Sequence, residues 1–273
     1  MIGIRIRTRD APRSTQRVRP WFDPLVPVLS IAGALVSWEL LSLLGILDER
    51  YIPSMSTTAG RLAEVVTTGE YWQALVNTLQ GWAIGLAIAV ALATPLGIVI
   101  GSNRLLYRSL QGIIEFLRPV PAVALIPVAI LIYGTGLKAK VFLAAFASFW
   151  PLFIQTLYGV QDVDPVATDT AKAFGLNRVE RMYKVTLRSA VPYIATGVRI
   201  SSAVALILAI IAEIVLGSPG LGREISRASG VARLDTMYAY IITIGLLGWL
   251  LNSVAMWANK RVLHWHPSYQ KAL

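Results

Sequence analysis

Charged residues are rare in the apolar stretches of this sequence, and those that occur there are the first candidates for chemistry. Glu115, Arg118, Arg199 and Glu213 each interrupt such a stretch. A charge at the centre of a membrane helix costs roughly 2.5–3.5 kcal/mol on insertion scales, so it indicates a function or a specific partner. Glu115 and Arg118 are three residues apart on one helix face and can neutralise each other. Arg199 can attract an anion or pair with Glu115.

Glu213 and two serines complete the set of candidate pathway residues. Glu213 precedes a glycine-rich loop that contains Gly220, and it can serve as a gate or accept hydrogen bonds from that loop. Ser201 and Ser202 can line a route or bond back to their own helix. The residues that we expect along a translocation pathway are Glu115, Arg118, Arg199, Ser201, Ser202 and Glu213.

Sites for covalent catalysis or metal binding are not visible in the sequence. There is no Cys, which excludes disulfides, thiolate ligands and a cysteine nucleophile. The patterns G-x-x-x-x-G-K-[ST], H-E-x-x-H and G-x-S-x-G are also missing. The pair His264 and His266 is typical of a tail at a membrane surface. We therefore predict that this chain is not an enzyme and binds no metal or cofactor itself.

The composition places these residues in a membrane. Of the 273 residues, 55% are hydrophobic and 15% charged, against about a quarter charged in soluble domains. The mean hydropathy is +0.61. A helix needs roughly 20 apolar residues to span a bilayer. Six stretches approach or exceed that length, at 25–47, 74–101, 113–134, 141–160, 192–216 and 238–258. We predict an all-α integral membrane protein with six transmembrane helices.

The second and third stretches carry packing signals. The third is interrupted by Pro119, Pro121 and Pro127. A broken helix is tolerated in a membrane where neighbouring protein or water satisfies the freed backbone groups, so we expect this stretch inside the bundle rather than against lipid. The second stretch holds two pairs of glycines at four-residue spacing. Such pairs allow a close approach of two helices, either within the monomer or at a dimer interface.

The distribution of positive charge predicts the orientation. With the N-terminus inside, the inner pieces contain 16 Lys and Arg and the outer pieces seven, of which Lys140 in the piece 135–140 is one. This is the positive-inside pattern, so both termini are expected in the cytoplasm. Orientation accounts for the net charge of +10, and nucleic-acid binding is not expected. We interpret residues 1–24 as a basic arm near anionic lipid, 25–260 as one transmembrane domain and 261–273 as a tail.

The longest inner loop, residues 161–191, is expected to begin with a short helix. Asp164 followed by Pro165 is an N-cap followed by a first-turn proline. Gly175 lies where a glycine ends a helix. Apolar residues recur on one face between these two signals.

A second short helix is expected after this glycine. Asn177 and Glu180 have the spacing of an Asn-capped capping box, and Pro192 is expected to open the fifth span. A helix of two turns cannot bury its apolar face alone. The loop therefore packs beneath its own bundle or docks on another protein, and the sequence leaves both possibilities open.

The same loop carries a resemblance to a known family. Asp169-Thr170-Ala171, three residues, Gly175, nine residues and Val185-Thr186-Leu187 resemble the EAA motif of ABC-importer permeases in every spacing. Three positions depart from the motif, because Asp169 replaces Glu, Thr170 replaces Ala, and Arg188 replaces a final Pro. The stretch 115–127, Ala212-Glu213-Ile214 and Gly220-Leu221-Gly222 resemble the nitrate/sulfonate/taurine group of these permeases.

This resemblance implies a type I ABC importer fold with a cytoplasmic coupling-helix loop, in a bacterial inner membrane. It implies a second permease copy, a homodimer, together with two ATPase subunits that bind ATP and Mg²⁺ and an extracytoplasmic substrate-binding protein. The expected substrate is a small anion such as a sulfonate, taurine or nitrate, with thiamine-pyrimidine or riboflavin-type precursors as the alternative. The residues expected to couple transport to the ATPase are Asp169, Thr170, Ala171, Gly175, Arg178, Arg181 and Tyr183.

Two other functions remain open from the residues alone. An ATPase-independent channel or ion-driven transporter needs no docking helix in the loop 161–191, and it usually has more than six spans or an internal repeat. A membrane enzyme needs a clustered nucleophile, metal or acid–base site, and none is visible in the sequence.

Overall fold

The computed structural model describes residues 25–264, and this part of the chain is helical without any strand. The elements in chain order are α1 Leu25–Leu43, α2 Met55–Val66, α3 Gly69–Ser102, α4 Arg104–Leu117, the 3₁₀ turn η1 Ala122–Leu125, α5 Ile126–Tyr133, α6 Leu137–Gln161, α7 Pro165–Ala173, α8 Arg178–Arg181, the π-helical segment η2 Met182–Thr186, α9 Leu187–Leu216, α10 Leu221–Gly230 and α11 Leu234–Val262. The basic arm and the end of the tail, including His266, lie outside the described residues.

The described helices agree with six predicted spans. Five spans are long and apolar enough to cross a membrane: α1, α3, α6, α11, and α9 together with α8 and η2. The sixth is a broken one, because α4 and the segment Ala122–Tyr133 qualify together but are bent by 80°. The bend follows Pro119 and Pro121, which cannot continue a helix.

The chain divides into two compact units, one ending at Ser56 and the other beginning at Thr57. In the first unit, the indole nitrogen of Trp38 donates to the carbonyl of Pro53 at 3.2 Å. The carboxylate of Glu39 accepts from the backbone N–H of Ser56 at 3.1 Å and from its hydroxyl at 2.8 Å. The loop after α1 is therefore held back onto α1 by polar contacts.

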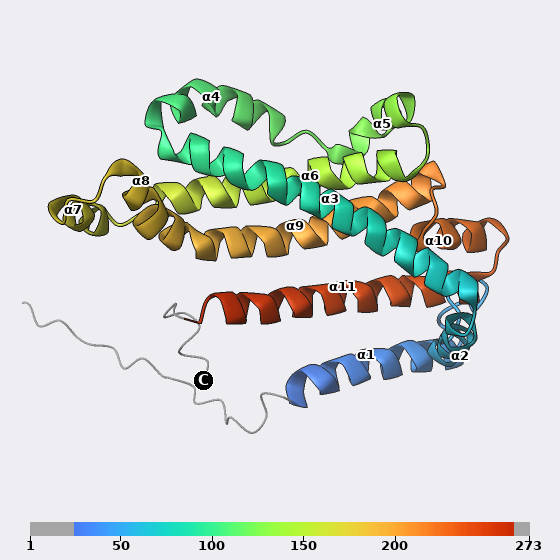
Figure 1. The fold of residues 1–273 in the computed structure, drawn as a ribbon. Helices are drawn as coiled ribbons and strands as arrows, with labels where there is room; N and C mark the ends of the chain where they lie inside the picture. Colours follow the sequence, from blue (N-terminus) through green and yellow to red (C-terminus); the bar gives the residue numbers. More distant parts are fainter. Residues whose placement is uncertain (1–24, 265–273) are drawn as a thin grey trace, which may run out of the picture. The chain divides into compact units, whose positions relative to one another are not determined.

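The core of the second unit is formed by α3, α6 and α9, which lie side by side (Figure 1). Their close approach depends on small residues. A Cβ placed on Gly85 of α3 would come within 2.7 Å of the Ala144 Cβ of α6, and one on Gly97 within 2.8 Å of the Thr156 Cβ. The glycine pairs of the second stretch thus pack within the monomer, which is one of the two roles that their spacing predicts.

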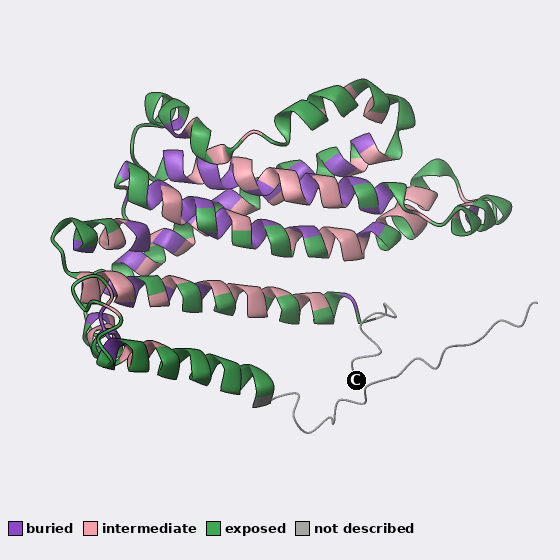
Figure 2. Ribbon diagram, turned by 180° about the vertical axis from the view of Figure 1, so that it is seen from behind, coloured by how far each residue is buried: buried purple, intermediate pink, exposed green. Residues whose placement is uncertain are grey.

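The third predicted span does not lie inside the bundle, which corrects our expectation from its prolines. Within the described chain α4 has no buried residue, and α5 buries only Ile126 and Ala129 (Figure 2). Phe116 is 75% and Leu131 87% exposed. The 80° bend explains this, because a segment that turns so sharply cannot follow α6 along its length.

Pro192 is also placed differently from our expectation. It lies inside α9 and does not open the fifth span. The backbone stays helical from Arg178 through η2 into α9, where five π-helical residues accommodate the change of hydrogen-bond register. Arg188 occupies the position at which the family motif has a proline, so no breaker separates α8 from the span.

Candidate functional site

The first short helix of the loop, α7, is fixed at both ends by its own sequence. The side chain of Asp164 accepts from the Val166 N–H at 2.8 Å, and Pro165 occupies the first helical position. After the helix, Gly175 adopts a φ of +75°. Its N–H donates to the Lys172 carbonyl at 2.9 Å, and the next N–H, that of Leu176, donates to the Ala171 carbonyl at 3.0 Å. This is the Schellman arrangement, in which glycine is strongly preferred.

The second short helix, α8, begins with the predicted capping box. The Asn177 side chain accepts from the Glu180 N–H at 2.9 Å, and the Glu180 carboxylate accepts from the Asn177 N–H at 2.9 Å. Because α8 continues through η2 into α9, the second half of the loop is joined to a membrane span without a flexible hinge.

Four large apolar side chains of the loop are mostly exposed. Val166 is 71% exposed, Phe174 80%, Val179 64% and Tyr183 69%. Only Ala171 of α7 is buried. We call the four exposed residues Val166, Phe174, Val179 and Tyr183 the loop patch. Packing of the loop beneath its own bundle is therefore not observed in the described chain, and the apolar face is available for contact with another protein.

The remaining residues of the predicted coupling set lie beside the loop patch. Asp169 pairs with Lys172 at 2.7 Å on the exposed surface. Thr170 and Arg178 are exposed, and Arg181 is half-buried. Among the described residues neither arginine has an ion-pair partner, since the acidic Glu180 pairs with Lys184 at 3.5 Å instead. The loop thus presents apolar groups together with two unpaired cations.

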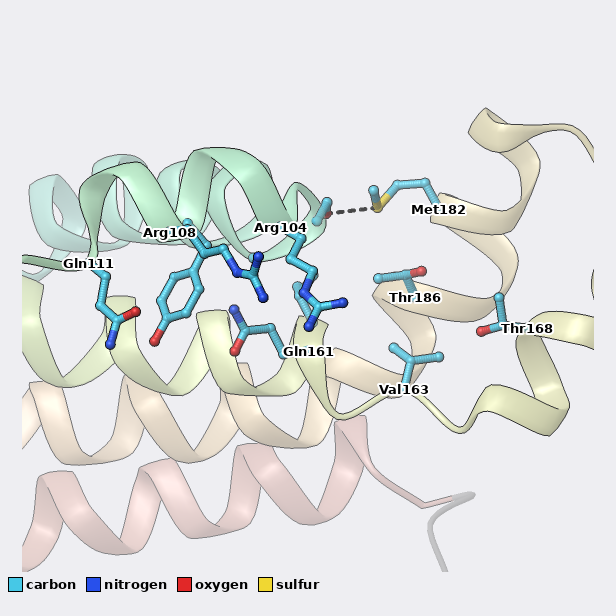
Figure 3. Close-up of a pocket in the computed structure, with 12 residues that line it drawn as sticks. Arg104, Arg108, Gln111, Gln161, Val163, Thr168, Met182 and Thr186 are labelled. Carbon is cyan, nitrogen blue, oxygen red and sulfur yellow. Dashed lines mark hydrogen bonds between the residues drawn. The ribbon is translucent and has the colours of Figure 1, made fainter.

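A cavity of about 600 Å³ lies between the start of α4, the end of α6, α7 and η2. Arg104 and Arg108 extend from α4 toward Gln161 at the end of α6 (Figure 3). Met182 of η2 borders the cavity and accepts a weak hydrogen bond from the Ser102 hydroxyl at 3.8 Å. The sequence alone does not predict this cavity, because the residues that line it come from several helices, among them the end of α3.

A buried ion pair lies near the other end of α9. Lys140 of α6 and Glu213 of α9 are 1% and 0% exposed, with Nζ 2.9 Å from Oε1. The ammonium also donates to the carbonyls of Asn77 at 2.9 Å and Pro219 at 2.8 Å, which uses all three of its protons. The hydroxyl of Thr78 donates to the other carboxylate oxygen, Oε2, at 2.9 Å. Such complete pairing is what a buried charge requires.

The start of α10 and the residue before it, Gly220, close over this pair. The Gly222 N–H donates to Glu213 Oε2 at 2.9 Å, and the Leu221 N–H donates to the Thr78 hydroxyl at 2.9 Å. A Cβ on Gly220 would overlap the Glu213 carboxyl group, and that residue has a φ of +154°. Glu213 therefore accepts a hydrogen bond from the Gly222 N–H in the first turn of α10, directly after the loop that contains Gly220.

Lys140 is the residue of this cluster that our sequence reasoning missed, and its assignment to an outer loop is wrong. It lies in the first turn of α6, which begins at Leu137, and it is buried. A signal was present in the sequence, because Glu213 lies near the outer end of one predicted span and Lys140 at the outer end of the span before it. Two opposite charges at the same depth of adjacent spans are candidates for pairing.

The other pathway candidates are scattered over the second unit. Glu115 accepts from the amide of Gln111 at 2.7 Å, and within the described chain it forms no ion pair with Arg118 or Arg199. Arg118 borders a separate cavity against α6. The Arg199 guanidinium donates to the Asn252 side chain at 2.9 Å.

The two serines are buried between helices. The Ser201 hydroxyl donates to the Ser148 carbonyl of α6 at 2.6 Å. The Ser202 carbonyl accepts from the indole of Trp82 at 3.0 Å. In the described range no group of His, Asp and Glu residues is arranged to hold a metal ion.

The comparisons with known proteins identify the family. Residues 93–264, which include the two-helix loop and the buried ion pair, match the model described as "Binding-protein-dependent transport system inner membrane component". The chain belongs to this family. It is a permease subunit of an ABC importer, embedded in the inner membrane as a multi-pass protein, and ATP hydrolysis is the work of a separate subunit.

Relatives of this permease place it in the nitrate/sulfonate/taurine group. It is 32% identical to the "Putative aliphatic sulfonates transport permease protein SsuC" of Escherichia coli (strain K12), over 93% of this chain and 94% of that protein. It is 32% identical to the "Nitrate import permease protein NrtB" of Leptolyngbya laminosa over 74% and 71% of the two chains. The "Taurine transport system permease protein TauC" of E. coli is 28% identical over 88% and 89%.

Solved structures agree on the fold. An inward-facing form of the MetNI methionine ABC transporter matches 68% of this permease and 93% of its own chain, with a TM-score of 0.60 and 18% identity. A chain of an amino acid ABC transporter crystallised with histidines matches 73% and 97%, with a TM-score of 0.60 and 18% identity. The fold is therefore that of type I ABC importer permeases.

Proposed function

We propose that this permease carries a small oxyanion, such as a sulfonate, taurine or nitrate, and that α7 and α8 dock on the ATPase that powers the transport. The similarity to permeases named for aliphatic sulfonates, nitrate and taurine supports the substrate class. The exposed loop patch is the observation that carries the docking assignment, because two short helices cannot bury such side chains on their own.

The structure of the loop suits the transmission of force. Rigid caps fix both ends of α7 and the start of α8, so the loop moves as a body. The 30 residues of α9 span about 45 Å from η2 to the Glu213 region. A displacement of α8 when the ATPase closes on ATP therefore reaches the far end of the bundle by rotation of a stiff helix. This is a rigid-body switch between outward-open and inward-open states.

We also propose the partners of the permease and its orientation in the membrane. Two copies of the permease, each on one ATPase subunit, enclose the pathway, and the exposed face of α4 and α5 lies toward the second copy. The ATPase subunits bind ATP and Mg²⁺. The loop patch and both termini lie in the cytoplasm, in line with the positive-inside distribution of charge. A substrate-binding protein delivers the anion from outside, at the end that contains α10.

The docking assignment is tested by co-purification of the ATPase with the permease. Phe174→Glu places a charge in the loop patch, and we expect it to abolish co-purification while membrane insertion stays normal. Gly175→Pro together with Asp169→Arg, which changes the loop backbone and reverses one charge, should have the same effect. The matched control is Val231→Glu, at an apolar residue after α10 that is also mostly exposed. Retained co-purification in Phe174→Glu would reject the assignment.

The substrate class is tested with the assembled importer in proteoliposomes. ATP-driven uptake is measured with labelled taurine, ethanesulfonate and nitrate, each delivered by the cognate binding protein. We expect uptake of at least one of these anions and none without ATP. Uptake of a pyrimidine or flavin precursor in their place would reject the anion assignment and leave the docking assignment intact.

A further inference from the structure

The cavity beside Arg118 has the features of a ligand site. It has a volume of about 430 Å³, within the roughly 300–1,000 Å³ typical of small-molecule sites. Its walls are contributed by the linker between α4 and η1, by the middle of α6 and by α9. The lining is apolar or aromatic except for three polar groups, which are the guanidinium of Arg118, the indole N–H of Trp150 and the amide of Gln155.

All three polar groups lack a partner. The indole nitrogen of Trp150 is buried and has no hydrogen-bond acceptor. Over residues 25–264 the side chains of Arg118 and Gln155 form no ion pair or hydrogen bond. The nearest carboxylate in sequence, that of Glu115, is occupied by Gln111 at 2.7 Å. A buried donor without an acceptor, such as the Trp150 indole, is unfavourable. Arg118 is exposed at the break between α4 and η1 and brings a positive charge to the edge of the cavity, so an acceptor that carries negative charge suits the site.

The position of the cavity fits a transport route. Trp150 lies at the middle of α6, which runs from Leu137 to Gln161, so the cavity lies about halfway along the span. Arg118 caps the end of α4, where the third span is broken by prolines. Broken helices near the middle of the membrane are where transporters commonly hold their substrates, because irregular backbone is tolerated there only beside protein or a polar cavity.

The chemistry of the three groups selects one class of ligand. Guanidinium, indole N–H and amide N–H are donors, and a guanidinium presents two parallel N–H groups that match two oxygens of one anion. Sulfonate and nitrate groups offer such oxygens. The apolar walls, including Phe146 and Ile154, suit the short carbon chain of an alkyl sulfonate.

We propose that Arg118, Trp150 and Gln155 form an oxyanion subsite at mid-membrane, through which the substrate passes after its release from the binding protein. This subsite rests on the proposed function as an importer of small oxyanions. Arg118 holds the anionic head as a fork, Trp150 donates one further hydrogen bond, and the Gln155 amide completes the shell. The anion leaves when the rotation of α9 changes the wall that α9 contributes.

The absence of Cys from the chain allows a direct binding test. A single cysteine is introduced at Ala147, which lines the cavity, in the full complex with its ATPase and binding protein. Its modification by a thiol reagent is followed by mass spectrometry of the permease chain. We expect saturating ethanesulfonate or nitrate to slow the modification about tenfold, and choline chloride at equal ionic strength to leave it unchanged. The control position is Ala203, in the cavity beside Arg199.

Three variants test which side chain causes the protection of the cysteine. Arg118→Met should abolish the protection by anions. Trp150→Phe keeps the ring but removes the N–H, and it should raise the half-protecting concentration about tenfold, which corresponds to one charge-assisted hydrogen bond. Gln155→Leu should have a smaller effect in the same direction. Where Arg118→Met does not assemble, the other two variants decide the test, because both retain the charge.

Several outcomes would overturn the subsite. Equal protection in Arg118→Met, protection of the Ala203 position, or unchanged half-protecting concentrations in both Trp150→Phe and Gln155→Leu would each do so. These failures differ from a failure of the proposed function. An unmodified complex that imports anions without protecting Ala147→Cys rejects the subsite alone, whereas a chain that neither retains an ATPase nor imports anions rejects the proposed function.

Discussion

The ammonium nitrogen of Lys140 lies 2.9 Å from a carboxylate oxygen of Glu213, and both side chains are almost completely enclosed by protein. This contact joins the start of α6 to the end of α9. Through Thr78 and the backbone of Gly222 it also fixes α3 and the start of α10. Four helices are therefore held at one point, at the end of α9 remote from the loop 161–191.

Breaking this ion pair on one side should be far more damaging than removing both charges. Lys140→Met leaves a buried carboxylate without its counter-charge, and removal of one partner of such a pair costs about 3–5 kcal/mol. For a chain of this size that lowers the melting temperature by roughly 10 °C. The double variant Lys140→Met with Glu213→Gln should recover more than half of the loss, because the amide still accepts from Gly222. Thermal unfolding of the detergent-solubilised complex measures the melting temperature of the single and the double variant.

The control for this prediction is an exposed pair of the same kind. Lys172→Met breaks the surface pair with Asp169, and such pairs contribute at most about 1 kcal/mol. Its melting temperature should stay within a few degrees of the unmodified protein. Equal effects of Lys140→Met and the double variant would show that the lysine stabilises the fold by packing rather than by charge.

Gly175→Ala should weaken ATPase docking without affecting the spans. The φ of +75° at this position costs a residue with a Cβ roughly 1–2 kcal/mol, which is a factor of about 5–30 in an equilibrium constant. The Schellman contacts of α7 are then lost in part, and the loop patch is no longer held rigidly. We expect the apparent affinity for the ATPase to fall by about that factor, as measured by titration of the ATPase onto reconstituted permease.

The matched control is Gly60→Ala in α2. A Cβ on Gly60 would meet no other atom within 4 Å, and the residue lies outside the docking loop, so its substitution should leave the affinity for the ATPase unchanged. An unchanged affinity in Gly175→Ala would mean that the cap of α7 is not needed for docking.

Gly85→Leu should destabilise the monomer, because α3 and α6 already touch at this point. Even a Cβ would approach that of Ala144 within 2.7 Å. Overpacking of a filled interface costs about 1–3 kcal/mol. Ala87→Leu, on the exposed side of α3, is the control and should leave the melting temperature unchanged. If Ala87→Leu lowered the melting temperature more than Gly85→Leu, the critical helix contact of α3 would lie outside the monomer.

The features that were predicted correctly from the sequence are local ones. The six apolar stretches are set by the length of chain needed to cross hydrocarbon, and each appears as a helix or a broken helix. The caps at Asp164 and Asn177 depend on residues within three positions, so their pattern is complete in a short segment. The resemblance to the EAA motif lies in the same segment, which is why the loop proposed to dock on the ATPase can be located from the amino-acid sequence alone.

The features that were missed depend on contacts between distant segments. The pairing of Lys140 with Glu213 needs α6 and α9 side by side, and the sequence offers only the matching depth of the two charges in adjacent predicted spans. The cavity with Trp150 and Gln155 likewise requires a linker that crosses α6. The exposure of the third span was mispredicted because the prolines indicate a break but not the direction of the 80° bend that follows it.

Substitutions at two neighbouring serines separate a packing role from a role in transport. The Ser201 hydroxyl donates to the Ser148 carbonyl at 2.6 Å, and hydrogen bonds between membrane helices contribute about 0.6 kcal/mol on average. Ser201→Ala should therefore lower the melting temperature by only a few degrees and leave the KM for uptake unchanged. A leucine at position 201 does not fit between α9 and α6, so Ser201→Leu should lower the melting temperature several times more than Ser201→Ala.

Ser202→Ala keeps the backbone carbonyl that Trp82 contacts, so the melting temperature of this variant should not change. A raised KM in Ser201→Ala at unchanged stability would instead place that hydroxyl on the substrate route, and the packing role would then be rejected.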